Sequence, residues 1–217
     1  MLDFFKKNKW PTISSDEMRK RARILVIDDE EFFYQTLFKK DGYNIDKWND
    51  VLDLQKLESG YYDIILLDIQ GVAKKISSDQ GLGLLKHLNK VSPAQIIIAY
   101  SNADWSLKYQ EFFKLADATL AKGKDYIEFK QTVDLLLSRR FSIDFYIDRA
   151  VSLAGASVVD HAKLKEIVSS SIRKNSPDKA SKQLSQITDN KDVIEVVVRV
   201  IQVAVQIMQI LTGLNHK

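Results

Sequence analysis

The stretch YYDIILLDIQ, residues 61–70, decides the fold. Its apolar centre, Ile64 to Leu67, is bounded by Asp63 and Asp68. A short, β-branched apolar run between polar residues is typical of a strand buried on both faces of a parallel sheet. In open α/β sheets, ligands bind at the carboxyl ends of the strands, so Asp68 is a candidate for chemistry. The alternative is an ordinary turn or helix-cap aspartate, because Asp is favoured at such boundaries.

Similar patterns recur on both sides of this stretch. Four further strands are predicted, at Ile24–Ile27, Tyr43–Trp48, Gln95–Tyr100 and Ala118–Leu120. A segment with helical periodicity follows each strand, and the one after the fourth strand is expected over 105–116. Five β-α units in succession predict the α/β class, with a five-stranded parallel sheet that is doubly wound, having helices on both faces.

Composition indicates a globular chain with an uneven charge distribution. Of the 217 residues, 45% are hydrophobic and 28% are charged, which is sufficient for a sizeable core. There is no cysteine, and the N-terminus has no apolar run of signal-peptide length, so we expect a cytoplasmic protein. Residues 1–22 form a basic arm. We expect a solvated tail there, with contact to nucleic acid or to an anionic surface as the alternative.

After the five β-α units, residues 141–217 are predicted to form an α-helical output or dimerisation region. No glycine or proline occurs between Gly123 and Gly155, which leaves open whether the fifth helix of the α/β domain, residues 23–140, continues to about Leu153. The last helix is expected from about Lys191 to Thr212.

In that last helix the polar residues form one stripe, and the rest of the circumference is apolar. A helix this apolar needs partners on several sides. We therefore expect a homodimer or a protein partner to contact it, in preference to a self-contained bundle, through Val197, Ile201, Ala204, Met208 and Leu211. Its five polar groups make a lone membrane-spanning helix too costly, so we expect no membrane span.

Five residues of chemical interest follow the predicted strands: Asp28, Asp29, Asp68, Ser101 and Lys122. Carboxylates that converge in one cleft repel each other unless a cation joins them. A set of hard oxygen ligands favours Mg²⁺. The Lys122 ammonium and the Ser101 hydroxyl would then stabilise the oxygens of a phosphoryl group in transfer.

Four motifs together resemble the receiver domain of two-component response regulators: Ile24-Leu-Val-Ile-Asp28-Asp29, Ile64-Ile-Leu-Leu-Asp68, Ile96-Ile-Ile-Ala-Tyr-Ser101 and Ala116-Asp-Ala-Thr-Leu-Ala-Lys122. The resemblance covers residues 23 to about 140 and implies the flavodoxin-like receiver fold. It implies that Asp68 accepts phosphate from a histidine kinase or a histidine phosphotransfer protein. It also implies that Mg²⁺ is held by Asp28, Asp29, Asp68 and the backbone carbonyl of Gln70. Ser101 and Lys122 would contact the phosphoryl group.

The chain departs from that family at three places. Gly123 stands where the family usually has a proline after the lysine, and Thr119 stands at the switch position where an aromatic residue is usual. The segment GVAKKISSDQG, residues 71–81, is longer than usual, and we expect an irregular solvated loop, with an additional contact surface or gate as the alternative.

The predicted function is therefore a response regulator in a phosphorelay, with Mg²⁺ as its cofactor and no catalysis beyond its own phosphorylation and dephosphorylation. Phosphorylation would switch the helical region, which would oligomerise or bind a protein partner. Two alternatives remain: a DNA-binding transcriptional regulator, which the scattered lysines after Arg140 do not favour, and a receiver-like scaffold that is not phosphorylated.

Overall fold

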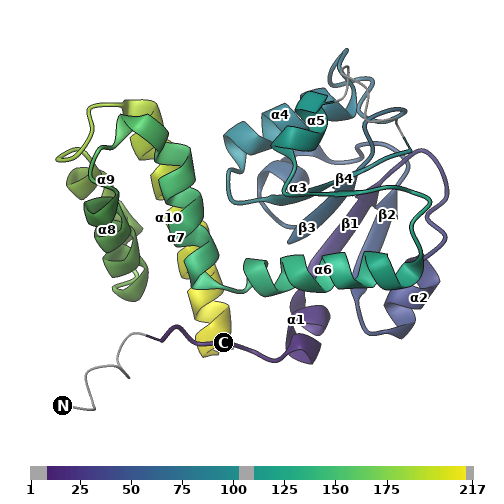
Figure 1. Ribbon diagram of the computed structural model, residues 1–217, viewed down its shortest axis with the longest axis horizontal. Coiled ribbons are helices and arrows are strands. Elements are labelled where there is room, and N and C mark those ends of the chain that lie inside the picture. Colours follow the sequence, from purple (N-terminus) through teal and green to yellow (C-terminus); the bar gives the residue numbers. More distant parts are fainter. Residues whose placement is uncertain (1–8, 103–109, 214–217) are drawn as a thin grey trace. The chain divides into compact units, whose positions relative to one another are not determined.

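The computed structural model describes residues 9–102 and 110–213, whose elements are shown in Figure 1. Contacts divide the chain into two compact units. The α/β unit is Ser14–Arg140, and the helical unit comprises Met1–Ile13 together with Phe141–Lys217.

The centre of the α/β unit is a five-stranded parallel sheet with the strand order β2-β1-β3-β4-β5. The strands are β1 (Arg23–Ile27), β2 (Asn44–Trp48), β3 (Ile64–Leu67), β4 (Ile96–Tyr100) and β5 (Ala118–Leu120). All four residues of β3 are buried, as expected for a strand covered on both faces. The prediction of a doubly wound, five-stranded parallel sheet is confirmed.

Six helices belong to this unit: α1 (Ser15–Arg21), α2 (Gln35–Lys40), α3 (Leu54–Glu58), α4 (Gly81–Val91), α5 (Gln110–Leu115) and α6 (Tyr126–Arg140). Buried leucines of α3 and α4, with Phe112 of α5, pack against the odd-numbered strand residues, such as Ile65 and Ile97. The part of the predicted 105–116 helix before Gln110 lies outside the described residues.

The opposite face of the sheet is closed by aromatic packing between α2 and α6. Phe32, Phe38, Tyr100 and Phe129 are buried, and the ring of Phe32 lies within 6.1 Å of each of the other three rings, centroid to centroid. Tyr100 is the last residue of β4, so this cluster reaches the carboxyl edge of the sheet.

Helix α1 was not expected, because its residues were assigned to the basic arm. It has no buried residue of its own, and it is held by polar contacts. The Arg19 guanidinium donates two hydrogen bonds to Asp134 of α6, at 3.0 and 2.7 Å, and the Tyr43 hydroxyl donates to the same carboxylate at 2.6 Å. The α/β unit therefore begins at Ser14.

The helical unit contains α7 (Ile143–Ala154), the 3₁₀ turn η3 (Gly155–Ser157), α8 (His161–Arg173), α9 (Pro177–Leu184) and α10 (Lys191–Thr212). Helix α6 ends at Arg140 and α7 begins at Ile143, so the fifth β-α helix does not continue through Phe141. The extended backbone of Ser142, with φ −112° and ψ 127°, interrupts it.

Helix α10 packs against α7, α8 and α9 of its own unit. Val197, Ile201 and Ala204 are fully buried and Leu211 is nearly so. These residues were expected to contact a partner, and this expectation is corrected: the chain's own helices already cover them. Met208, the fifth residue of that set, is partly exposed and lines a cavity of about 300 Å³ with Ile172, Arg173 and Val205 among others.

By length and composition, α10 is the one helix in the described ranges that could cross a membrane, although a third of its most apolar 18-residue window is buried within the chain. A single helix of this kind is weak evidence for a membrane span, because a core helix of a soluble protein passes the same test. Gly213 ends α10 in the left-handed conformation, with φ 71°, which glycine adopts without strain.

Candidate functional site

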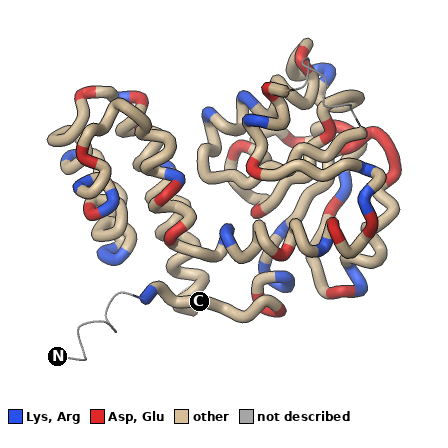
Figure 2. Tube along the Cα trace, viewed as in Figure 1, with Lys and Arg blue, Asp and Glu red and all other residues tan. Residues whose placement is uncertain are grey.

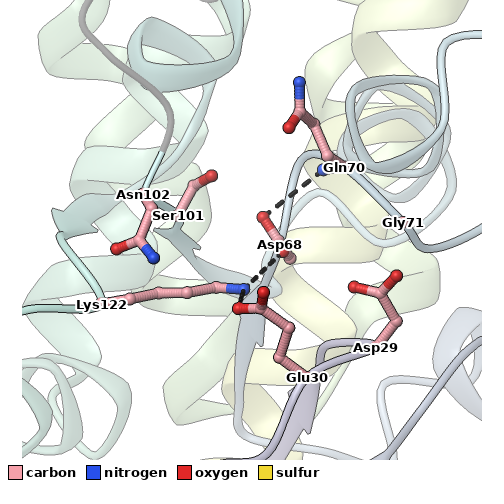
Figure 3. Close-up of a pocket in the computed structure, with 8 residues that line it drawn as sticks. All are labelled: Asp29, Glu30, Asp68, Gln70, Gly71, Ser101, Asn102 and Lys122. Atoms are coloured by element: carbon pink, nitrogen blue, oxygen red, sulfur yellow. Dashed lines mark hydrogen bonds and ion pairs between the residues drawn. The ribbon is translucent and has the colours of Figure 1, made fainter.

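The site lies where three central strands end together. The strands are parallel and pair Ile27 with Leu67 and Leu67 with Ala99, so their carboxyl ends meet at one edge. The run of four acidic residues that follows β1 is visible there in red in Figure 2. A cavity of about 320 Å³ opens at this edge and is lined by Asp29, Glu30, Asp68, Gln70, Gly71, Ser101, Asn102 and Lys122 (Figure 3).

Lys122 is the central cation of the site. Its ammonium contacts three carboxylates, with Nζ 2.7 Å from Asp68 Oδ2, 2.9 Å from Asp28 Oδ1 and 2.9 Å from Glu30 Oε2. Only a tenth of the Lys122 side chain is exposed. The single positive charge of Lys122 is therefore outnumbered by the carboxylates around it, and the site carries a net negative charge.

The surroundings raise the pKa values of both Asp28 and Lys122. Burial raises the pKa of Asp28, although the hydrogen bonds from Lys122 and from the Glu30 backbone N–H oppose this rise. Burial alone would lower the pKa of Lys122, but its hydrogen bonds to Asp68, Asp28 and Glu30 outweigh burial and raise it. Lys122 is therefore charged at every physiological pH.

The acidic residues fit a divalent cation. Asp28, Asp29 and Asp68 each offer a carboxylate oxygen within 4.8 Å of the others. Asp28 is fully buried, and its Oδ2 accepts no hydrogen bond from the described residues. An unpaired buried carboxylate oxygen is costly unless a cation contacts it. Oxygen donors in this number suit Mg²⁺, which binds through few protein groups and retains several waters.

The backbone after β3 orients Asp68. Its Oδ1 accepts a hydrogen bond from the Ile69 N–H at 2.7 Å and a longer one from the Gln70 N–H at 3.4 Å. Gly71 has φ 82°, and a Cβ there would lie 2.2 Å from the carboxylate oxygens of Asp29. The positive φ favours glycine at this position, whereas the Asp29 carboxylate is the end of an exposed side chain that can move.

Most residues predicted from the sequence meet at this cavity. Asp29, Asp68, Ser101 and Lys122 line it, and Asp28, which does not, accepts a hydrogen bond from Lys122. Gln70 lines it too, with its side chain directed away from Asp68 (Figure 3). Thr119 is the exception: it lies within β5, paired with Ala99, and does not line the cavity, so its predicted role in switching gains no support.

Three residues at the site were not singled out from the sequence. Glu30 accepts a bond from Lys122, Asn102 lines the cavity, and the Tyr100 ring lies 5.6 Å from the Lys122 Nζ. Each directly follows or precedes a predicted site residue, so proximity to a strand end was the available signal. Burial raises the pKa of Tyr100 to about 12, which keeps its hydroxyl neutral.

The raised pKa of Asp28 leads to a test in the absence of metal. A raised pKa means that folding favours the protonated carboxyl, so this contribution to stability is present at low pH and lost as pH rises through that pKa. Asp28→Asn mimics the protonated group. In EDTA, the melting temperature of this variant minus that of wild type is expected to increase as the pH is raised from 4 to 8. A difference in melting temperature that does not change with pH would contradict this assignment.

No known protein family and no curated protein match the sequence. Solved structures do match. A CheY-like response regulator receiver domain protein from Methanospirillum hungatei is 19% identical, with a TM-score of 0.47, covering 55% of this chain and 95% of that one. The signal receiver domain of a putative Luxo repressor protein from Vibrio parahaemolyticus is 22% identical, with a TM-score of 0.46, covering 55% of this chain and 92% of that one.

The response regulator TrrA from Thermotoga maritima, in complex with Mg²⁺-BeF, is 28% identical with a TM-score of 0.43, covering 53% of this chain and 98% of that one. These similarities concern about half of the chain and leave the C-terminal helices unassigned. The strand order β2-β1-β3-β4-β5 of the α/β unit is itself that of the flavodoxin-like, CheY-like fold.

Proposed function

We propose that this chain is a cytoplasmic response regulator, in which the α/β unit receives a phosphoryl group on Asp68 from a phosphohistidine and the helical unit carries the output. The observation that supports it most directly is the convergence of Asp28, Asp29, Asp68 and Lys122 at one cavity. The residue types and their positions at the strand ends are those needed for phosphoryl transfer between carboxylate and imidazole.

In the proposed reaction, the Asp68 carboxylate attacks the phosphorus of the phosphohistidine. A bond forms between phosphorus and a carboxylate oxygen of Asp68, while the bond between phosphorus and the imidazole nitrogen breaks. The imidazole departs with the electron pair and takes up a proton. The Ile69 and Gln70 N–H groups hold the carboxylate in place before the reaction.

Lys122 supplies positive charge where negative charge develops. Its Nζ already lies 2.7 Å from Asp68 Oδ2, so a small movement transfers its hydrogen bond to a phosphoryl oxygen. The Ser101 hydroxyl, on the cavity wall, is a second donor to that group. Mg²⁺, held by Asp28, Asp29, Asp68 and the Gln70 carbonyl, would neutralise the incoming phosphoryl charge.

Phosphorylation would then alter the helical unit, which would self-associate or bind a protein partner. The exposed apolar residues of this unit include Val159, which is 97% exposed, and Leu153. We propose no catalytic activity beyond formation and hydrolysis of the aspartyl phosphate. Light scattering of the purified protein, with and without beryllofluoride and Mg²⁺, distinguishes the two. A rise in molecular mass indicates self-association, and an unchanged mass favours binding of a different protein.

The experiment that tests the reaction uses acetyl phosphate as a small phosphoryl donor. Wild-type protein in Mg²⁺ is expected to gain the mass of one phosphoryl group, and Asp68→Asn is expected to gain none, because the amide cannot accept it. EDTA should prevent the gain in wild type. If wild type stays unmodified in Mg²⁺, the unit is a scaffold that is not phosphorylated.

A further inference from the structure

The peptide bond between Gln70 and Gly71 is held from one side by a side chain that comes from the start of α4. The Gly71 N–H donates a hydrogen bond to Gln80 Oε1 at 2.8 Å. A trans peptide is planar, and its C=O points opposite to its N–H. Fixing the Gly71 N–H therefore fixes the direction of the Gln70 carbonyl, which is the oxygen assigned to Mg²⁺ above.

We propose that Gln80 is a positioning residue for the metal site: its amide oxygen aims the Gln70 carbonyl at the cation. This inference rests on the proposed function, because it concerns the same Mg²⁺ site. Partners outside the ligand set commonly determine how well the ligands are aligned, and their loss weakens metal binding.

The backbone of Gln80 supports a dedicated role for its side chain. Gln80 has φ 53° and ψ −129°, a conformation that residues other than glycine rarely adopt. It occupies the N-cap position of α4, yet its side chain makes no capping hydrogen bond to that helix. The amide is directed to Gly71 instead. A glycine would suit this backbone better but would leave the Gly71 N–H without its acceptor.

The neighbouring residues leave the metal-site backbone little freedom to move. The Gly81 N–H donates to the Ile69 carbonyl at 3.2 Å, and a Cβ on Gly81 would lie 2.0 Å from the Asp68 carbonyl oxygen. The start of α4 thus packs against the backbone of Asp68, and the Gln80 side chain is hydrogen-bonded to Gly71. The two contacts bracket the Gln70 carbonyl.

The intervening loop was expected to be solvated throughout, and its first part is not. Val72 and Ala73 are buried, and the Ala73 N–H donates to Asp50. At its far end, Gly83 lies against Ser77, where a Cβ would be 2.0 Å from the hydroxyl oxygen. Because both ends of the 71–81 loop contact the rest of the unit, the loop places Gln80 beside Gly71.

Three variants of the full-length chain separate the acceptor from the backbone. Gln80→Glu keeps an oxygen acceptor at the same length, Gln80→Met has similar length and no acceptor, and Gln80→Gly relieves the backbone conformation and has no acceptor. The readouts are the Mg²⁺ dissociation constant by calorimetry, checked by Mn²⁺ binding in electron paramagnetic resonance, and the melting temperature in EDTA.

We expect Gln80→Met and Gln80→Gly to weaken Mg²⁺ binding about 10-fold, whereas Gln80→Glu binds at least as tightly as wild type. Gln80→Gly is expected to melt no lower than wild type in EDTA, so its weaker metal binding cannot come from unfolding.

If Gln80→Met and Gln80→Gly bind Mg²⁺ as wild type does, the positioning role is refuted and the proposed function stands. If Gln80→Glu weakens binding as much as Gln80→Met, the oxygen acceptor is not the cause and the role is likewise refuted. Wild type that binds neither Mg²⁺ nor Mn²⁺ overturns the proposed function itself.

Discussion

Replacing Asp63 with alanine is expected to lower the free energy of unfolding of the α/β unit by about 3–5 kcal/mol, the usual cost of removing one partner from a buried ion pair. Asp63 Oδ1 accepts from Arg140 Nε at 3.0 Å, and Oδ2 accepts from the Arg23 N–H at 2.8 Å. Both side chains of the pair are less than 10% exposed. The substitution leaves the Arg140 guanidinium buried without its carboxylate.

Urea unfolding with hydrogen exchange in β1 and β3 measures this loss in the α/β unit separately from the helical unit. Glu128→Ala is the matched control, because it removes a carboxylate that pairs with Lys124 on the exposed surface of α6 and should cause no measurable loss. Arg140→Met combined with Asp63→Ala is expected to cost less than the sum of the two single variants. Equal stabilities of Asp63→Ala and Glu128→Ala would contradict the assigned role.

Lys122→Met is expected to slow phosphorylation of Asp68 by acetyl phosphate about 10²–10³-fold, as is typical when one preorganised donor to a developing charge is removed. The variant loses the ammonium that contacts Asp28, Glu30 and Asp68. It also leaves buried Asp28 without its cation, so a lower melting temperature in EDTA is expected, with partial recovery in Mg²⁺.

The control for Lys122→Met is Lys124→Met, two residues further along. Lys124 pairs with Glu128 on the surface and does not line the cavity, so its loss should leave the phosphorylation rate unchanged. The rate constants are measured by quenching the reaction at a series of times, at several acetyl phosphate concentrations, and determining the phosphorylated fraction. Equal rates for Lys122→Met and wild type would remove Lys122 from the proposed reaction.

The sheet and most of the site were predictable because two simple regularities coincide. Fully buried parallel strands have uninterrupted apolar runs, such as Ile64 to Leu67, and this run is buried throughout. Parallel strands also end at a common edge, so Asp28, Asp68 and Lys122, distant in sequence, were expected to meet there. The bonds from Lys122 to both carboxylates confirm that expectation.

Features that depend on tertiary contacts were harder to predict. Helix α1 has no apolar face, and its attachment depends on Arg19 meeting Asp134, 115 residues away. A local signal did exist: Ser14 is followed three residues later by Glu17, the capping-box spacing, and the Ser14 hydroxyl accepts from the Glu17 N–H.

In the helical unit, the sequence did not indicate which helices pack together. Apolar periodicity in α10 indicates that the helix must be covered but not what covers it, so a partner was expected where α7, α8 and α9 already pack. The role of Gln80 had no sequence signal either, since it depends on a loop that brings its amide back to Gly71.

Mapping the phosphoryl group tests the central claim most directly. Borohydride reduction of the acetyl phosphate-treated protein converts an aspartyl phosphate to homoserine, which peptide mass spectrometry locates. The account predicts homoserine at residue 68 in wild type, formed in Mg²⁺ and not in EDTA. Homoserine at Asp28 or Asp29 in place of Asp68, or none at any aspartate, would contradict it.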